Sequence, residues 1–584
     1  AASPVLAVQP LVDGSVWFGT RDAGAYRMGG DGRLRQFLPT ADGRGLPSAR
    51  VDQLVADAAG GVWLGTAAGL ARWQDDRFQP PDMLGANALP VTALGLDAQG
   101  ALWSSTSVGT DVRQLPSLQP DAGRAHAGHR WLGHSRDGGQ WFSDGMRVWW
   151  QDRSGQHTHA IALPGSDRRT RPGIARVVED RQGRAWLLGS HQGLWRLGAQ
   201  WRHVQRFTAP VSQGGAAAAG LAAAADGTAW QARGGWLTRV SPTSGFDRLR
   251  WPYAHDPART DRHAVADDGR GQVWVFAAPW LTRIDGTRGP QQHWLVADEH
   301  GALPDPPSGG HAVLRICGDH LWLAGLGRLE QRTRAGTVLG TWSYDAVQLR
   351  PGGAPFVLHC DATEQMWLGD RDGLKRWQPA VGRFVPVPGA ARRQAGALHV
   401  AADGRLWVAD AEGWVAYRDD AGRLQRSHQF DAAQGLPAVL PRGLVDAGDG
   451  TLWATTARGV VSLQPDQRRI RLYTAEDGMP MMVLASDLIV AGQYLMAMGV
   501  DGDLLVLDPA GMAAATVPPM LVIDRVQVRR HGRWIELPAA DPLRLNADDR
   551  DIQLSARLLT GGQGGVSDYR FRLRGEDPDW VRAG

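Results

Sequence analysis

The sequence predicts an all-β protein of about twelve four-stranded propeller blades, arranged as two β-propellers and followed by a partial C-terminal immunoglobulin-like β-sandwich. Three observations carry this prediction. A tryptophan-centred block recurs along most of the chain, the segments between its copies are short and alternating, and the composition changes at Pro518. A chain of 584 residues is also too long for one ordinary hydrophobic core.

The recurring block is clearest from Leu46 to Trp73, which reads LPSARVDQLVADAAGGVWLGTAAGLARW. Its central tryptophan returns at intervals of roughly 40 to 50 residues, the length of one propeller blade. The copies stand at Trp17, Trp63, Trp103, Trp141, Trp186, Trp230, Trp274, Trp322, Trp367, Trp407 and Trp453, with Leu495 in the last copy.

Each copy is interpreted as four short strands. Runs such as 51–55 and 70–73 are bounded by Gly, Asp or Pro every few residues, which argues against helical repeats of similar length. The Asp-x-x-Gly turn ahead of several copies, as in Asp57 to Gly60, fixes a hairpin because the carboxylate bonds the turn and the glycine takes positive φ. We therefore interpret the recurrent Asp and Trp residues as structural.

From Pro518 the sequence reads PPMLVIDRVQVRRHGRWIEL and later YRFRLRGEDPDW, unlike the blades. The predicted domains are 1–300 and 301–517 for the two propellers and 518–584 for the partial sandwich. The first boundary is placed in the Pro- and Gly-rich segment between Pro290 and Pro307. Seven blades followed by five, six followed by six, further blades without a recognisable motif, and one large ring are all compatible with the count.

The block at 46–73 resembles the two-component regulator propeller repeat, as do 177–197 and 365–377, and the segment from Pro518 resembles the Y-Y-Y domain. Propeller repeats of this kind followed by a Y-Y-Y domain are found in periplasmic sensor regions of bacterial histidine kinases, hybrid two-component proteins and diguanylate cyclases. The resemblance implies a periplasmic ligand-sensing region of a transmembrane signalling protein, with an oligosaccharide or other extracellular solute as ligand.

The same resemblance implies a homodimer through the C-terminal sandwich, further sandwich strands and then a membrane helix beyond Gly584. An opening Ala1-Ala2-Ser3 without an initiator Met adds weak support for secretion. The 63 basic and 60 acidic residues are interspersed and give a net charge of only +3, so no nucleic-acid partner is expected.

Two cysteines are too few for a disulfide framework and lack the spacing of a zinc site. Cys317 and Cys360 each end an apolar strand just before a motif tryptophan. Neighbouring blades would bring them together, so a disulfide is one alternative, and two buried thiols are the favoured one.

No catalytic residue, metal ligand or cofactor is predicted, because most carboxylates recur in the turns and the closest histidine pairs, His157 with His159 and His255 with His263, lack a further ligand. A double-propeller carbohydrate-active hydrolase is the first alternative function and needs a carboxylate pair outside the turns. A protein-binding scaffold is the second.

The tryptophans outside the motif position have no recurrent counterpart, and some of them simply extend the packing of the blades. They are Trp131, Trp150, Trp201, Trp251, Trp294 and Trp342. Aromatic platforms flanked by polar groups bind sugars, and one connection has that mixture. Its predicted ligand-binding residues are Arg250, Trp251, Tyr253, His255, Asp256, Arg259 and Arg262. The competing interpretation is a loop held by its own polar contacts.

Overall fold

The computed structural model describes residues 3–41, 43–79, 88–115, 117–155, 158–161, 173–189, 193–210, 220–255, 263–296, 312–325, 328–343, 357–370, 372–390, 393–420, 422–474, 477–480, 483–484, 486–513, 520–538, 544–559, 570–572, 579 and 581–582. The chain forms two compact units, Ala1–Ala513 and Ala514–Gly584. The second unit begins close to the predicted boundary at Pro518. Within the described ranges, no helix is long and apolar enough to cross a membrane.

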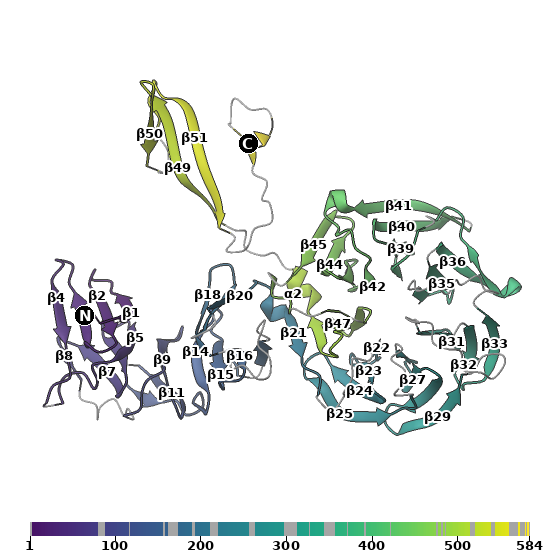
Figure 1. Ribbon diagram of the computed structural model, residues 1–584, viewed down its shortest axis with the longest axis horizontal. Helices are drawn as coiled ribbons and strands as arrows, with labels where there is room; N and C mark the ends of the chain where they lie inside the picture. The colour runs from purple at the N-terminus through teal and green to yellow at the C-terminus, as the bar shows by residue number, and fades with distance from the viewer. Residues whose placement is uncertain are drawn as a thin grey trace. The chain divides into compact units, whose positions relative to one another are not determined.

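The first unit begins with five antiparallel sheets that follow one another along the chain (Figure 1). Their first strands contact one another in sequence order, as blades of a propeller do. The sheets consist of β1 (Val5–Pro10), β2 (Val16–Thr20), β3 (Ala25–Met28) and β4 (Leu34–Phe37); β5 (Val51–Ala56), β6 (Val62–Thr66), β7 (Gly69–Gln74) and β8 (Arg77–Phe78); β9 (Ala93–Leu96), β10 (Leu102–Thr106), β11 (Gly109–Gln114), β12 (Gln119–Pro120) and β13 (His126–Ala127); β14 (Arg130–His134), β15 (Gln140–Ser143), β16 (Val148–Gln151) and β17 (Thr158–Ile161); and β18 (Ile174–Glu179), β19 (Ala185–Gly189) and β20 (Leu194–Leu197).

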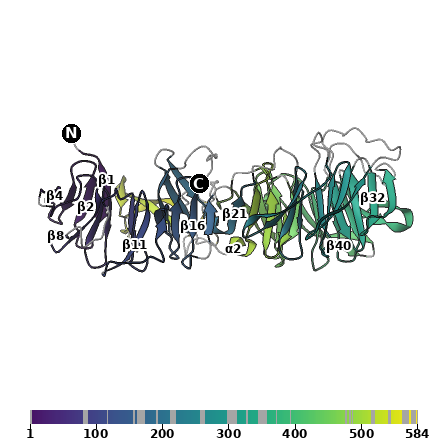
Figure 2. The ribbon, with the colours of Figure 1, turned by 90° about the horizontal axis from the view of Figure 1, so that it is seen from below.

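Seven further sheets form a closed ring (Figure 1). Seen from the side, the strands cross the thickness of the ring (Figure 2). Six of the sheets are β22 (Gly220–Ala223), β23 (Ala229–Arg233), β24 (Trp236–Ser241) and β25 (Gly245–Pro252); β26 (Ala264–Asp267), β27 (Gln272–Ala277), β28 (Trp280–Asp285) and β29 (Gly289–Leu295); β30 (Val313–Cys317), β31 (His320–Gly325), β32 (Arg328–Thr333) and β33 (Val338–Ser343); β34 (Val357–Cys360), β35 (Met366–Asp370), β36 (Gly373–Gln378) and β37 (Arg383–Pro386); β38 (Ala397–Val400), β39 (Leu406–Ala409), β40 (Gly413–Asp420) and β41 (Arg423–Asp431); and β42 (Arg442–Asp446), β43 (Leu452–Thr456), β44 (Gly459–Gln464) and β45 (Arg469–Tyr473).

The seventh blade of the ring is built from both ends of its segment. β46 (Ile489–Ala491), β47 (Tyr494–Met498) and β48 (Leu504–Leu507) pair in order, and β21 (Val204–Phe207) adds as the outermost strand. Val204 lies opposite Leu507, and Phe207 lies opposite Leu504. β46 contacts the first strands of both neighbouring blades, β42 and β22. The ring is therefore closed by hydrogen bonds between strands about 300 residues apart.

The predicted boundary between 300 and 301 needs correction. β29 and β30 lie on either side of it, yet they belong to neighbouring blades of one ring, whose first strands β26 and β30 contact each other. The described blades run five and then seven, which differs from seven followed by five, from six followed by six and from one large ring. The Pro- and Gly-rich segment marks only a connection between blades, because the ring is defined by the pairing of β21 with β48.

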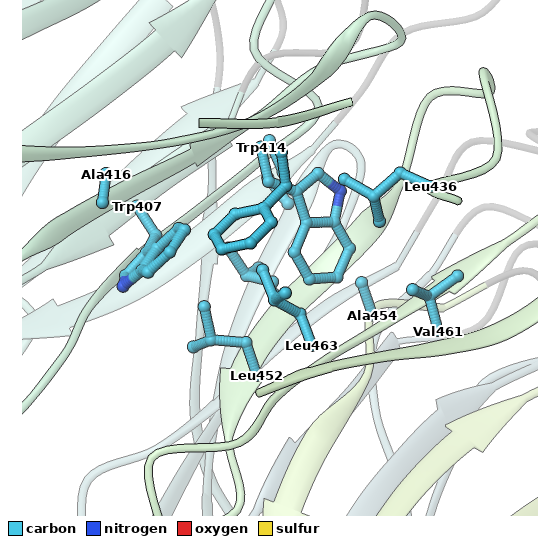
Figure 3. Packing of buried hydrophobic residues seen from close by; sticks show 12 residues of the cluster. Trp407, Trp414, Ala416, Leu436, Leu452, Ala454, Val461 and Leu463 are labelled. Carbon is cyan, nitrogen blue, oxygen red and sulfur yellow. The ribbon is translucent and has the colours of Figure 1, made fainter. Parts of the chain in front are cut away.

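The all-β fold class and the position of the motif tryptophan are confirmed. The motif residue lies on the second strand of each blade, from Trp17 in β2 to Leu495 in β47. Most of these tryptophans are buried, and Figure 3 shows Trp407 and Trp414 in one cluster with Leu452 and Leu463 of the next blade. Burial of 150–250 Å² per side chain contributes roughly 4–6 kcal/mol of transfer free energy, which offsets the entropy of ordering the blade.

The turn aspartates do more than fix a hairpin. In Asp57, Asp97, Asp180 and Asp361, one carboxylate oxygen accepts two backbone N–H groups of the turn, and the other accepts the indole N–H of the motif tryptophan at 2.7–2.9 Å. Among the described residues, four motif tryptophans have an indole N–H with no partner. Trp17, Trp141 and Trp453 lack an acid at the equivalent position, whereas Trp274 has Asp268 there, whose carboxylate accepts the turn N–H groups of Arg270 and Gln272 but not the indole N–H. In the blades of Asp57, Asp97, Asp180 and Asp361, the carboxylate connects the turn to the blade core.

Three of the six tryptophans outside the motif position belong to a second repeat. Trp251, Trp294 and Trp342 occupy the fourth strands β25, β29 and β33, a position that Phe37 and Tyr473 fill elsewhere. Four of these aromatic rings stack on the motif tryptophan of their own blade, with centroid separations of 5.0–6.3 Å: Phe37 on Trp17, Trp294 on Trp274, Trp342 on Trp322 and Tyr473 on Trp453. The expectation that Trp251, Trp294 and Trp342 lack a recurrent counterpart is therefore wrong. The repeat is not visible as a tryptophan pattern because phenylalanine or tyrosine fills the same position in other blades.

A disulfide joins Cys317 at the end of β30 to Cys360 at the end of β34, with Cα atoms 5.5 Å apart. Of the two alternatives that the sequence leaves open, the bridge is therefore the one found. It links the innermost strands of neighbouring blades.

In the described ranges, short helices accompany the blades: the 3-10 helices η1 (Trp201–His203), η2 (Pro379–Val381) and η3 (Ala432–Gln434) and the α-helix α2 (Pro509–Ala513). The second unit holds the antiparallel strands β49 (Met520–Arg530), β50 (Arg533–Leu537) and β51 (Arg550–Leu559), and the pair β52 (Arg570–Phe571) and β53 (Val581–Arg582). Val526 and Val528 are buried in it, whereas Ile552 and Leu554 are exposed.

Acidification is expected to destabilise the protein between pH 7.5 and 5. Burial lowers the pKa of His159, His263 and His359 to about 4 each, below the value of about 6.5 in the unfolded chain. Above pH 6.5 these histidines are neutral in both states and do not lower the free energy of unfolding. As the pH falls toward 4, the unfolded chain binds protons that the folded protein does not, and the free energy of unfolding drops by about 1–2 kcal/mol per histidine at pH 5. The measurement is the urea midpoint at both pH values.

The control for this pH effect is His359→Gln, which keeps a group able to accept the Val400 N–H but cannot titrate. The difference between the two midpoints should be smaller in the variant than in the wild-type protein. Equal midpoints at pH 7.5 and 5 in the wild-type protein would contradict the assignment of these histidines as neutral.

Candidate functional site

A cavity of about 1100 Å³ lies at the axis of the ring. Each of the seven blades contributes residues at or just before the start of its innermost strand, among them Gly220, Val313, Val357 and Gly396. The β43–β44 turn adds a further part of the wall. Small-molecule sites are typically concave spaces of about 300–1,000 Å³, so the axial cavity has room for a ligand of several rings.

An ion pair joins two blades that are not neighbours in the ring. Arg315 on β30 donates to Asp487, which lies just ahead of β46, at 3.2 Å. Two backbone carbonyls also fix the guanidinium, which donates to the carbonyl oxygens of Leu358 and Leu314 at 3.2 and 3.0 Å. Arg315 is thus a fixed cation in the cavity wall, with Asp487 as its counter-ion.

The other carboxylate in the wall is also paired. Asp501 accepts from Arg206 of β21 at 2.9 Å, and Arg206 contacts Asp503 as well. The backbone carbonyl of Asp501 accepts from Arg233. Asp501 therefore holds the closing strand β21 against β48, which is a structural task.

Arg458 lies on the tight turn between β43 and β44 and is exposed. Thr456 shapes this turn, because its hydroxyl donates to the Gly459 carbonyl at 2.9 Å and accepts the Arg458 N–H at 3.1 Å. Gly459 takes a φ of 138°, which a residue with a Cβ rarely adopts. Within the described part of the chain, no ion-pair partner of Arg458 is found. Arg442, also exposed, lies at the start of β42 in the same wall.

Tyr253 and His263 connect the predicted loop to the cavity. His263 lines the cavity, and its Nδ1 lies 2.7 Å from the buried Tyr253 hydroxyl. Burial and, to a smaller extent, the nearby His255 lower the pKa of His263 to about 4, so the imidazole is neutral at pH 7. Burial likewise raises the pKa of the Tyr253 hydroxyl. This pair can offer hydrogen bonds to a ligand but no charge.

Of the other predicted ligand residues, the described ones, Arg250, Trp251 and His255, are not among the residues that line the cavity. The Arg250 guanidinium lies over the Trp236 ring at 4.7 Å, and the Trp251 indole donates to the Gly286 carbonyl at 3.3 Å. His255 lies beside Tyr253. Asp256, Arg259 and Arg262 lie outside the described residues. A sugar-binding role for this loop stays a prediction, although the occurrence of Trp251 in the fourth-strand repeat removes its main motivation.

The residues that sequence reasoning missed are Arg315, Arg442, Arg458 and Asp487. They come from four different parts of the chain, and none belongs to a motif. Arg315, Arg442 and Asp487 stand at or near the start of an innermost strand, but at different distances ahead of the second-strand motif residue. Placing the start of each innermost strand would have put them together in the cavity wall.

No protein-family model and no curated protein matches this sequence. Among solved structures, it is similar to the extracellular domain of BT3049 from B. thetaiotaomicron, a protein assigned to the hybrid two-component systems, at 13% identity and a TM-score of 0.64, over 100% of this chain and 86% of that one. The extracellular domain of BT4673 from the same organism gives 15% identity and a TM-score of 0.42, over 100% and 81%. PorZ of Porphyromonas gingivalis gives 12% and 0.39, over 96% and 93%. The likeness to BT3049 shows a shared propeller fold.

Proposed function

We propose that this chain is the ligand-sensing, extracytoplasmic region of a bacterial transmembrane signalling protein and that the axial cavity of the ring receives the ligand. The observation that carries the proposal is the cavity of about 1100 Å³, to which all seven blades contribute. A ligand there contacts many blades at once. The fold shared with an extracellular domain of a hybrid two-component system supports the sensing role.

The bridge between Cys317 and Cys360 supports an extracytoplasmic location. Disulfides persist in the periplasm and outside the cell and are rare in the reducing cytosol. The periplasm is accordingly the proposed compartment.

The charges of the cavity favour binding over hydrolysis. A glycosidase needs a carboxylic acid and a second carboxylate that flank the scissile bond. The two carboxylates described in this wall, Asp487 and Asp501, are each engaged by an arginine, Arg315 and Arg206. A hydrolase of the double-propeller kind is therefore the weaker proposal.

The proposed ligand is an oligosaccharide fragment or a similar extracellular solute, and the proposed output passes through the segment 518–584. A ligand that binds two states of the protein unequally shifts their populations by the difference in its binding free energies. A homodimer through the C-terminal sandwich would convert that shift into a change at the membrane.

The proposal is tested with a panel of neutral and acidic oligosaccharides. A binding glycan should raise the melting temperature, because a ligand at 100 times its Kd stabilises the folded state by about 2.7 kcal/mol. The same mixtures should release no new reducing ends. Hydrolysis of a glycan would overturn the proposal in favour of an enzyme, and the absence of any shift across the panel would overturn it in favour of a protein-binding scaffold.

A further inference from the structure

The first of the five blades ahead of the ring has a largely exposed apolar face. In the second blade (β5–β8), Leu54 and Leu64 pair on the face toward the first blade and are 9% and 0% exposed. The matching pair of the first blade (β1–β4) is Val8 and Phe18. Val8 is 56% exposed, and Leu34 on the same face is 61% exposed. The surface that every following blade buries against its predecessor is therefore open on the first blade.

The fifth blade (β18–β20) is open on the opposite face. Trp186 is the one motif tryptophan of the described blades that is not buried. Leu188 and Leu194 pair beside it and are 49% and 58% exposed. Leu70 has the position of Leu194 in the second blade and is only 5% exposed, because the third blade packs on it. The first and fifth blades thus present the two halves of the interface that joins neighbouring blades, and such apolar surfaces mark interaction sites.

The fifth blade also lacks an outer strand among the described residues. β20 pairs with β19 and with no further strand of the described ranges, whereas each of the other blades has a fourth strand there. The next strand along the chain, β21, is the outer strand of the seventh blade of the ring. An unpaired strand edge presents a row of backbone N–H and C=O groups to which another strand can add. In the ring, the chain directly ahead of the first blade fills this position.

We propose that the five blades are completed by two further blades and by an outer strand on β20, all supplied by residues ahead of Val5 in the same polypeptide. One added blade covers the face of Val8, and the other covers the face of Trp186. The number follows from the ring, where seven blades of this repeat close a circle, since blades of one repeat turn by a similar angle from one to the next. Five blades then leave space for two, whereas a second copy would bring five.

The order of the added segment also follows from the ring. There the outer strand β21 precedes the first blade and pairs with the last one. The same order ahead of Val5 places the outer strand first and the two blades after it. Blades of roughly 40–50 residues make this segment about 80–100 residues long. The inference rests on the open faces and on the free edge of β20, and it is independent of what the axial cavity binds.

Cysteine labelling tests the proposal in two forms of the protein, the chain 1–584 and the protein as its own cells make it. Leu188→Cys should react readily with a maleimide in the chain 1–584. In the natural protein it should react at least about tenfold more slowly, because labelling then requires the blade interface to open. Val8→Cys reports the other face in the same way. Arg418→Cys is the matched control, since Arg418 is exposed on β40 of the ring, and it should react equally in both forms.

Mass spectrometry of the natural protein decides where the covering segment comes from. It should show about 80–100 residues ahead of Ala1, with two more tryptophan-centred blocks. A mature natural chain that begins at Ala1 would overturn the proposal, and protection of Leu188→Cys in such a chain would assign the open faces to a second copy or to another protein. Equal labelling of Leu188→Cys in the two forms would also overturn it. Each of these results leaves the proposed sensing function intact, because that function is measured separately with the glycan panel.

Discussion

Replacing Asp57 by alanine is expected to lower the free energy of unfolding by about 3–5 kcal/mol, the largest effect of any single change considered for this protein. Asp57 and Arg72 form an ion pair of 2.7 Å whose side chains are only 4% and 6% exposed. The same carboxylate accepts the Trp63 indole N–H and the backbone N–H groups of Ala59 and Gly61. Its removal leaves a buried guanidinium without a counter-ion and an indole without an acceptor, and both are costly.

Denaturant titration followed by hydrogen exchange of the β6 and β7 peptides measures this loss. Asp57→Asn should fall between the wild-type protein and the alanine variant, because an amide oxygen still accepts the turn bonds but the ion pair is gone. Asp111→Ala is the control, since Asp111 is exposed on β11 of the next blade and its change should stay within about 0.5 kcal/mol. If Asp57→Ala and Asp111→Ala were equally stable, the connecting role of the turn carboxylates would be wrong.

The sequence predicts the repeated parts of this fold well, because each blade carries its own local signals. The position of Trp63 on the second strand and the turn from Asp57 to Gly60 both follow from patterns within a few residues. The pattern does not predict that the second carboxylate oxygen of Asp57 accepts the Trp63 indole N–H, because the two groups meet only once the hairpin has formed.

The division into rings could not be predicted, because it depends on a long-range pairing. The strand Val204–Phe207 has the composition of any outer strand, and it could complete the sheet that contains β20. It pairs instead with Leu504–Leu507, to which Arg206 adds ion pairs with Asp501 and Asp503. Such a choice is decided by the packing of the whole ring.

The candidate site escaped prediction for a similar reason. Sequence reasoning looked for residues close together in one loop and selected Arg250 to Arg262, of which Tyr253 reaches the cavity wall through His263. The axial cavity is assembled from short stretches of seven blades, so Arg315 and Asp487 meet only after the ring has closed. A propeller distributes its site over the whole sequence, and a search for local clusters cannot find it.

Loss of the disulfide is the second large effect. The double variant Cys317→Ala and Cys360→Ala is expected to be less stable than the wild-type protein by about 2–4 kcal/mol, because the bridge closes a loop with a sequence separation of 43 and restricts the unfolded chain. Cys317 is buried among Trp322, Leu358 and Met366, so part of the loss is a packing loss.

Wild-type protein treated with a reductant separates these two contributions, because its thiols keep their volume while the cross-link is gone. Reduction alone should account for most of the loss of the double variant, and the denaturation midpoint of the variant itself should not respond to the reductant. Mass spectrometry after alkylation should count no free thiol in the untreated protein and two after reduction. Two free thiols in untreated protein purified from the periplasm would contradict the bridge and would remove its support for an extracytoplasmic location.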